Sequence, residues 1–434
     1  MRVAVVGGGI SGLGAAFALK DSHEVTLFEK ETRIGGHAHT VDVEYNGARI
    51  PVDTGFIVFN GHNYKHFTAL LDHLRVATYA SDMSFAVSDP SGFEWSTNGL
   101  AGMFAWKRNL ARPGFLAMLG DILRFSTRAR ADLAANRNIE GRSLAQYVES
   151  LNLSRGFMRD YLLPMGAAIW STPENEMMRY PAASFLRFFD NHRLLHARRP
   201  EWRTVAGGSR SYVQAVRGAL GARISSGAGV MEVQRAPEGV NVLIAGHGWQ
   251  SFDQVIFACH SDEALAILGD SATPAERAAL QAIRYLPNTA YLHRDESLMP
   301  RRRAAWASWN YMRGRGGPDS VCLTYWMNLL QNIDRAYPLF VTLNPTTPPA
   351  ADLTFDRFEY AHPQFNAEAM AAQREIQALQ GENRTRFAGA WLGYGFHEDG
   401  LASGLAAAKG LGARLPWEVG VSLVDPVSAA RAAA

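Results

Sequence analysis

A glycine-rich run and one acidic residue near the start of the chain have the types and the spacing that suit nucleotide binding. The letters GGGISG occupy residues 7–12, and Glu29 follows 17 residues after Gly12. Gly7 permits a tight turn, Gly9 lets the backbone approach a pyrophosphate, and Gly12 lets a helix pack closely on a strand. The Glu29 carboxylate can accept hydrogen bonds from both hydroxyls of a ribose. The pattern predicts cofactor contacts at Gly7, Gly9, Ser11, Gly12 and Glu29.

Two strands and a helix must position these residues. Residues 2–6 contain three valines, which is typical of a buried parallel strand, and helical spacing begins at Ile10. Residues 25–28 form the next expected strand, with Glu29 at its end. The free amides at the helix start and the positive end of its dipole favour phosphate groups. A glycine-rich turn without a ligand is the alternative, but the strand–turn–helix–strand–acid order favours binding.

Composition narrows the class of protein. The chain has 434 residues, enough for two or three domains, and it is 47% hydrophobic and 19% charged, which is ordinary for a globular protein with a large core. A net charge of +2 implies no nucleic-acid partner. Two cysteines, Cys259 and Cys322, fit a reducing compartment, and no metal-ligand spacing occurs. With no signal peptide and no long apolar run, we expect a cytoplasmic protein, alternatively peripheral to the inner face of the membrane.

A second glycine pair follows the acidic residue. Residues 29–37, EKETRIGGH, resemble the E-x-x-x-R-x-G-G-R segment of the FAD-dependent amine oxidase and phytoene desaturase superfamily. In that superfamily the paired glycines pass beside the FAD pyrophosphate. Glu31 and His37 stand where arginines are usual, and His37 can replace one of them as a neutral donor. The resemblance implies FAD as the cofactor, with contacts from Lys30, Arg33, Gly35, Gly36 and His37.

Two later segments resemble the same superfamily. Its D-x-G segment, where the backbone meets the flavin ring, corresponds to residues 53–55 here, which implies contacts from Gly55 and Phe56. Asp53 itself is either part of this contact or a turn-capping carboxylate. Residues 229–233 resemble the strand whose backbone clasps the adenine, which implies a contact from Val230.

The C-terminal part resembles the closing motif of the superfamily. A strand and loop over residues 387–404 precede an expected helix over residues 405–409. The start of that helix would point at the flavin, where its dipole stabilises negative charge on the reduced ring. The implied contacts are Gly389, Gly395, Gly400, Leu401 and Ser403.

The middle of the chain allows two interpretations at several places. Residues 99–137 form a basic amphipathic helical stretch interrupted at Pro113, either a membrane-surface or lipid-entry face or an ordinary helical cap, and we favour the cap. Residues 157–170 and 181–189 are rich in aromatics and Met, which suits the wall of an apolar cavity or a core. The strand-rich residues 287–344 carry aromatics that either line a pocket or pack on neighbours, namely Trp306, Trp309, Tyr311, Tyr325 and Trp326.

These segments predict an α/β fold: a Rossmann-like FAD-binding domain of the three-layer, glutathione-reductase type with an inserted α+β substrate domain. We expect the FAD-binding domain to comprise residues 1–80, 200–275 and 383–434. The substrate domain would then comprise residues 81–199 and 276–382.

The resemblance is strongest to predicted NAD/FAD-binding proteins of this superfamily, some of them linked to modification of membrane fatty acids. Many amine oxidases place a lysine near flavin N5, but this chain has no lysine between Lys107 and Lys409. We therefore expect an FAD-dependent oxidoreductase that takes a hydride from an apolar substrate at N5, as a desaturase of membrane lipid acyl chains. An amine or isoprenoid oxidase and a non-catalytic lipid-binding escort protein are the alternatives. No residue stands out as a catalytic base, and the oligomeric state stays open.

Overall fold

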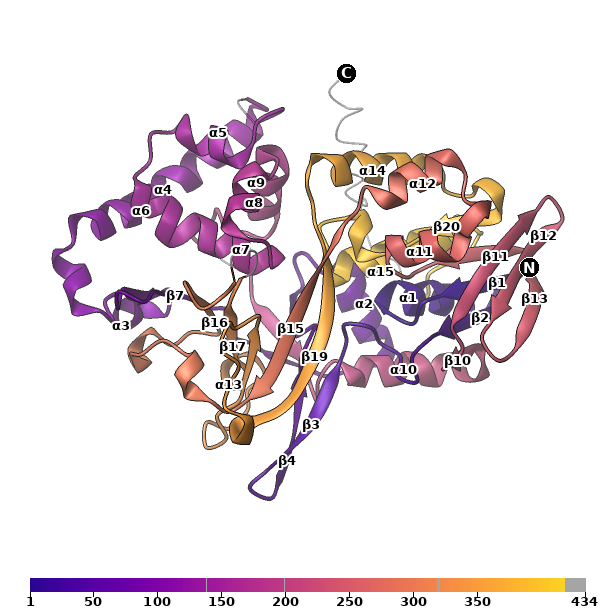
Figure 1. Ribbon diagram of the computed structural model, residues 1–434, viewed down its shortest axis with the longest axis horizontal. Coiled ribbons are helices and arrows are strands. Elements are labelled where there is room, and N and C mark those ends of the chain that lie inside the picture. Colours follow the sequence, from indigo (N-terminus) through magenta and orange to yellow (C-terminus); the bar gives the residue numbers. More distant parts are fainter. Residues whose placement is uncertain (138, 199, 318–320, 418–434) are drawn as a thin grey trace.

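The computed structural model describes residues 1–434 apart from 138, 199, 318–320 and 418–434. Figure 1 shows a parallel sheet with its helices at one end of the molecule, a group of helices at the other end, and a large mixed sheet between them. The last part of the predicted FAD-binding domain, residues 418–434, lies outside the described residues.

The parallel sheet has five strands in the order β10 (Ile224–Ser226), β2 (Glu24–Glu29), β1 (Arg2–Val6), β14 (Gln254–Phe257) and β20 (Thr385–Phe387). Its centre is β1, in which Val3 and Val5 are fully buried. Residues far apart in sequence become neighbours here, since Val3 is paired with Gln254. The strands predicted at residues 2–6 and 25–28 are confirmed.

Both faces of this sheet are covered. On one face, the core around Val3, Val5 and Leu27 includes residues of α1 (Ile10–Leu19), α2 (Lys65–Leu74), α10 (Arg210–Leu220) and α15 (His397–Lys409). On the other face, the core around Phe28 and Phe257 is closed by the antiparallel strands β11 (Val230–Ala236), β12 (Gly239–Ile244) and β13 (Gly248–Phe252) with α11 (Ser261–Leu268), α12 (Pro274–Gln281) and α14 (Ala367–Ala378). The predicted three-layer α/β fold is confirmed.

Helix α15 begins eight residues earlier than predicted, at His397 instead of residue 405. Gly400 and Gly404 lie inside it although glycine is a poor helix former. The reason is close packing on α1, because a Cβ built at Gly404 would overlap the carbonyl oxygen of Ser11. The implied contacts at residues 400–403 therefore belong to the helix and not to a loop before it.

The mixed sheet has seven strands in the order β19 (Thr354–Pro363), β15 (Tyr285–His293), β18 (Phe340–Leu343), β17 (Leu323–Trp326), β16 (Trp309–Met312), β7 (Phe85–Ser88) and β8 (Glu94–Ser96). Two small antiparallel sheets lie between the mixed sheet and the parallel sheet along the chain. One pairs β3 (Thr40–Tyr45) with β4 (Ala48–Asp53), and the other has the order β5 (Val58–Asn60), β9 (Trp202–Val205) and β6 (Thr78–Ala80). The β3–β4 turn has positive φ at Asn46 and Gly47, as a two-residue hairpin turn of type I′ requires.

The helical end of the molecule is built around one aromatic core. Its elements are α3 (Gly99–Met103), η1 (Lys107–Ala111), α4 (Pro113–Ala134), α5 (Leu144–Glu149), α6 (Arg155–Phe157), η2 (Met158–Leu162), α7 (Leu163–Trp170), α8 (Glu174–Arg179) and α9 (Ala182–Asn191). Phe115, Met118 and Phe125 of α4 are at most 2% exposed and enter this core. The inner face of the amphipathic stretch is thus an ordinary helical cap.

Short helices complete the connections: η3 (Gly221–Arg223), η4 (Gly269–Ser271), η5 (Glu296–Leu298), η6 (Arg303–Ala305), α13 (Met327–Leu330), η7 (Ala351–Leu353), η8 (Glu382–Arg384) and η9 (Ala390–Leu392). Helices α12 and α14, most of which we expected in the substrate domain, share a core with β14 of the parallel sheet. The division into two domains stays a prediction.

Within the described part of the chain, no helix has both the length and the apolar character needed to cross a bilayer.

Candidate functional site

Three glycines of the first glycine turn differ in whether the fold itself requires them. At Gly7, with φ +111°, a Cβ would lie 2.7 Å from the carbonyl oxygen of Ala258, and at Gly12 it would overlap the carbonyl oxygen of Gly7. At Gly9 a Cβ would meet no atom within 4 Å. Gly9 is also the N-cap of α1, which has no side-chain cap and no acidic residue in its first turn. Open space beside uncapped amides fits an anionic group.

The second glycine pair lies against the first. The Gly35 amide donates to the carbonyl of Gly8 (2.8 Å), and a Cβ at Gly36 would lie 3.1 Å from the Cα of Gly9. Arg33 holds this loop, because its guanidinium donates to the carbonyls of Gly36 (3.0 Å) and Ala38 (3.2 Å). The predicted FAD contact of Arg33 would therefore add to a structural role.

Glu29 and Lys30 have protein partners in addition to their predicted ones. The Glu29 carboxylate accepts hydrogen bonds from the amides of Gly8 (2.6 Å) and Glu31 (2.9 Å). A carboxylate has about four acceptor positions, so two stay free for ribose hydroxyls. The Lys30 ammonium pairs with Glu263 at 2.6 Å. Val230 begins β11 just after Ala228, whose amide donates to the carbonyl of Glu29 (2.9 Å), so the predicted adenine strand does lie beside the predicted ribose residue.

His37 carries an unsatisfied polar atom at this place. Its Nε2 is buried and has no hydrogen-bond partner among the described residues. Its carbonyl accepts from the amide of Phe56 (2.8 Å), and a Cβ at Gly55 would overlap the same carbonyl. The second glycine pair and the Gly55–Phe56 segment are thus in direct contact. A buried donor or acceptor without a partner is costly, so His37 fits a bound polar group.

The C-terminal segment joins the same place through its contact with α1. A Cβ at Gly400 would lie 2.9 Å from Cγ2 of Ile10 and 3.0 Å from Oγ of Ser11. Other predicted contacts of this segment and of α1 have side chains that face the protein. Ser11 is 5% and Leu401 0% exposed, and Ser403 Oγ accepts a hydrogen bond from the amide of Gly389 (2.8 Å). A Cβ at Gly395 would meet the ring of Phe365. Only the backbone of these residues is left for a cofactor.

The start of α15 also carries acidic residues. Glu398 accepts hydrogen bonds from the amides of His66 (2.7 Å) and Phe67 (2.9 Å), at the start of α2, which has no cap of its own. Burial raises the pKa of Glu398 to about 7 and that of Asp399 to about 6. The ring of His397, the residue before Glu398, stacks on the ring of Phe56 with centroids 3.7 Å apart. Negative charge on these two carboxylates therefore partly offsets the positive end of the α15 dipole, which we expected to point at the flavin.

Three histidines and a tyrosine form a group that the sequence did not predict. His37 lies 5.1 Å from Tyr360, 5.4 Å from His362 and 6.4 Å from His260 between ring centroids. Burial lowers the pKa of His37 well below its ordinary value, lowers that of His362 to about 4, and lowers that of His260, so the rings are uncharged at neutral pH. The available signal was the alternation of Tyr360 and His362 on one face of β19. The described residues contain no group that could hold a metal ion.

A hydrogen-bond chain fixes the proton of His362. Asn344 Nδ2 donates to Asn288 Oδ1 (2.7 Å), and Asn288 Nδ2 in turn donates to Nδ1 of His362 (2.9 Å). Because Nδ1 accepts, the neutral ring carries its proton on Nε2.

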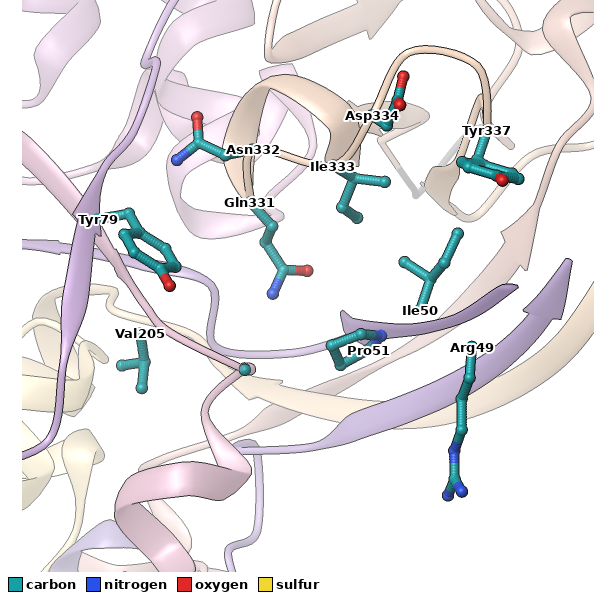
Figure 2. A pocket seen from close by; sticks show the side chains of 12 residues that line it. Arg49, Ile50, Pro51, Tyr79, Val205, Gln331, Asn332, Ile333, Asp334 and Tyr337 are labelled. Atoms are coloured by element: carbon teal, nitrogen blue, oxygen red, sulfur yellow. The ribbon is translucent and has the colours of Figure 1, made fainter. Parts of the chain in front are cut away.

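Asp53 is a capping carboxylate, the second of the two interpretations we considered. It accepts from the backbone amide of Ser209 (2.9 Å) at the start of α10, and from Thr40 Oγ1 (2.6 Å) and Gln331 Nε2 (3.0 Å). Burial raises its pKa to about 6. Gln331 also lines a cavity of about 310 Å³, shown in Figure 2, between the β3–β4 hairpin and residues 331–337. None of the predicted cofactor residues lines this cavity.

The aromatics predicted as pocket candidates mostly pack on one another. Trp306 and Trp326 meet edge to face at 5.1 Å, and Trp309 and Tyr325 do so at 5.0 Å. A different aromatic group reaches the C-terminal segment. Phe188 stacks on Phe396, the residue before α15, at 4.9 Å. It joins the aromatic core of the helical end to the site.

The three-layer fold and the glycine segments that it brings together define a dinucleotide-binding protein, and the sequence match to a flavin enzyme family makes it an oxidoreductase with FAD as its cofactor. The chain belongs to the family of flavin containing amine oxidoreductases, whose model matches residues 10–293. No curated protein matches the chain in sequence. Family membership gives no support to a non-catalytic escort protein.

Solved structures share the fold along nearly the whole chain. Putrescine oxidase with bound putrescine is 16% identical, with 95% of this chain and 100% of that chain covered and a TM-score of 0.68. A CLA-producing fatty acid isomerase from P. acnes is 13% identical, with 94% and 98% covered and a TM-score of 0.66. Cyclohexylamine oxidase from Brevibacterium oxydans is 16% identical, with 94% and 98% covered and a TM-score of 0.66. Likeness at these identities shows the fold.

Proposed function

We propose that this enzyme dehydrogenates an apolar substrate, the acyl chain of a membrane lipid. The observation that carries the proposal is the aromatic group at the C-terminal segment. Phe188 contacts Phe396 (4.9 Å), Tyr394 (5.9 Å) and Trp170 (4.6 Å) between ring centroids, which continues the apolar core of the helical end to the residue before α15. Tyr394 and Phe396 are only half-buried, and an apolar surface of this kind suits a hydrocarbon chain.

The residues of the chain would act by exclusion and orientation. Bound FAD supplies the hydride acceptor. Gly9, Gly36 and His37 would hold its pyrophosphate, and Glu29 its ribose. The aromatic side chains would exclude water and orient a C–H bond, while His362, neutral and protonated on Nε2, adds no charge beside His37. Uncharged rings beside the cofactor favour an uncharged substrate.

An amine oxidase is the second candidate, because two of the structures with this fold are named as oxidases of putrescine and cyclohexylamine. The lipid substrate is supported by another, a fatty acid isomerase. The strands β15 to β19 also contain no lysine to stand near flavin N5, unlike many amine oxidases.

The test is the absorption spectrum of the purified enzyme under anaerobic conditions. We expect the oxidised flavin band to bleach on addition of membrane lipid extract, and a new double bond to appear in recovered acyl chains. Each turnover would remove a hydride from one carbon, for which FAD is the acceptor, and a proton from the adjacent carbon, which passes to solvent. Bleaching by an amine panel with release of ammonia, and no change with lipid, would reject the proposal in favour of the amine oxidase.

A further inference from the structure

We infer that the outer face of α3, η1 and α4 docks on the surface of an anionic lipid bilayer. Four of its leucines, which we call the outer leucines, are exposed: Leu100 (74%), Leu110 (60%), Leu116 (48%) and Leu123 (71%). The outer leucines fall within residues 100–123, whereas the other large exposed apolar side chains of the described residues lie far apart in the sequence: Met1, Tyr79, Met178, Met231 and Trp249. Single exposed apolar residues are normal, whereas a group of them marks an interaction site.

Helix α4 is apolar on two faces. Its inner face places Phe115, Met118 and Phe125 in the core. Leu116, Gly120 and Leu123 follow the spacing i, i+4, i+7 on the outside, where a surface helix normally carries polar residues. Core packing therefore explains the inner face and leaves the outer leucines without a function.

The charges around the outer leucines have one sign. Residues 97–137 contain seven basic residues and two acidic ones, Asp121 and Asp132. Both acids are buried (4% and 2% exposed) and pair with Arg124 (2.8 Å) and Arg128 (3.1 Å) on the same helix. Within the described residues, this stretch therefore exposes no carboxylate. Lysines and arginines around an apolar face fit anionic lipid headgroups.

The position of the surface agrees with peripheral contact. Figure 1 shows α3 and α4 at the end of the molecule opposite the parallel sheet. Helices α1 and α15, which carry predicted cofactor contacts, would therefore stay away from the bilayer. Trp106, half-buried at this end, has the guanidinium groups of Arg108 (5.8 Å) and Arg112 (5.7 Å) over its ring. Tryptophan with cations beside it is typical of a membrane interface. The inference rests on this surface alone and not on the proposed substrate.

The test is flotation of the FAD-loaded enzyme with vesicles of phosphatidylcholine, alone or mixed with phosphatidylglycerol. We expect binding to the mixed vesicles only, weakened by salt. The double variant Leu116→Ser/Leu123→Ser should bind about tenfold more weakly, and Lys107→Gln/Arg130→Gln should also bind more weakly. The matched control Met231→Ser/Trp249→Ser, which removes side chains of similar exposure (62% and 47%) on β11 and β13, should bind like the wild type.

Flavin absorbance and the melting temperature of each variant establish that it is folded. The inference is wrong if the wild type does not float with anionic vesicles at low salt, or if the leucine variant and the control bind equally. It is also wrong if the leucine substitutions dissociate an oligomer in solution, because the face would then bind protein. Vesicle binding without flavin bleaching by lipid would reject the proposed substrate and leave the docking surface intact.

Discussion

At the scale of residues, Gly9 is the part of the glycine turn where we expect a ligand to bind. Its backbone has φ −74° and ψ −177°, which any residue can adopt, and its missing side chain faces no protein atom within 4 Å. Neither strain nor packing therefore requires glycine there. We expect that its open side instead leaves room for the cofactor.

Gly9→Asp should weaken FAD binding without lowering stability. Aspartate is a favourable N-cap, so the cofactor-free protein should be as stable as the wild type. Its carboxylate would occupy the phosphate position and repel the pyrophosphate, so we expect FAD affinity to fall by about tenfold or more. Titration with FAD and thermal unfolding measure the two effects. Gly9→Asn, equal in size and capping, should lose less affinity, and equal losses would contradict a charge effect.

Glu398 gives a second prediction, on pH. Its folded pKa of about 7 lies above that of glutamate in an unfolded chain (about 4.3), so the stabilisation is present in acid and is lost as the pH rises through about 7. Between pH 5 and pH 8 we expect the free energy of unfolding of the wild type to fall by roughly 2 kcal/mol more than that of Glu398→Gln. Urea titrations measure this difference, with exposed Glu149→Gln as a control that follows the wild type. Parallel pH profiles for wild type and Glu398→Gln would contradict it.

Single residues also show how far the sequence alone could lead. The turn at Gly7 and the close packing at Gly12 were predictable from their spacing, whereas the pyrophosphate contact of Gly9 stays a prediction. The group of His37, His260 and His362 was not, because it needs a turn, a strand end and an edge strand to meet. The contact of Lys30 with Glu263 was missed for the same reason, since these residues are 233 positions apart, whereas Arg33 contacts carbonyls of its own loop.

At the scale of elements, α1 and α15 approach each other as closely as their glycines allow. Gly404→Ala would place a methyl group against the backbone of Ser11, and backbone cannot move aside cheaply. We expect a loss of about 3 kcal/mol in the free energy of unfolding, with loss of FAD, as urea titration and flavin absorbance would show. Gly120→Ala on α4 meets no atom within 4 Å and should instead stabilise by up to about 1 kcal/mol. Equal effects of the two substitutions would contradict close packing of α1 on α15.

The start of α15 and the faces of α4 were the least predictable features at this scale. Glycines that break isolated helices are retained in α15 by a contact that no local pattern shows. In α4 the sequence suggested a choice between core and surface, whereas the helix serves as core on one side and exposes leucines on the other.

At the scale of the whole molecule, the predicted FAD contacts come from segments as far apart as Gly9, Gly36, Gly55 and Gly400. A ligand that joins them should stabilise the entire fold. We expect the melting temperature to rise with free FAD, by several degrees at concentrations near 100 times the dissociation constant, where binding contributes about 2.7 kcal/mol. Calorimetry of the cofactor-free protein at increasing FAD measures this. A melting temperature independent of FAD would show that the segments meet for another purpose.

The strand order of the parallel sheet also matters for how the protein is made. β1 and β2 leave the ribosome early, but Gln254, the partner of Val3, follows about 250 residues later, and β20 later still. At a translation rate of roughly 5–20 residues per second, the edge of β1 that pairs with β14 stays unpaired for on the order of 10 to 50 s. An open apolar strand edge is a template for aggregation. Newly made chains should therefore need a chaperone until β14 has been synthesised, and slowing translation between these strands should lower the yield of native enzyme.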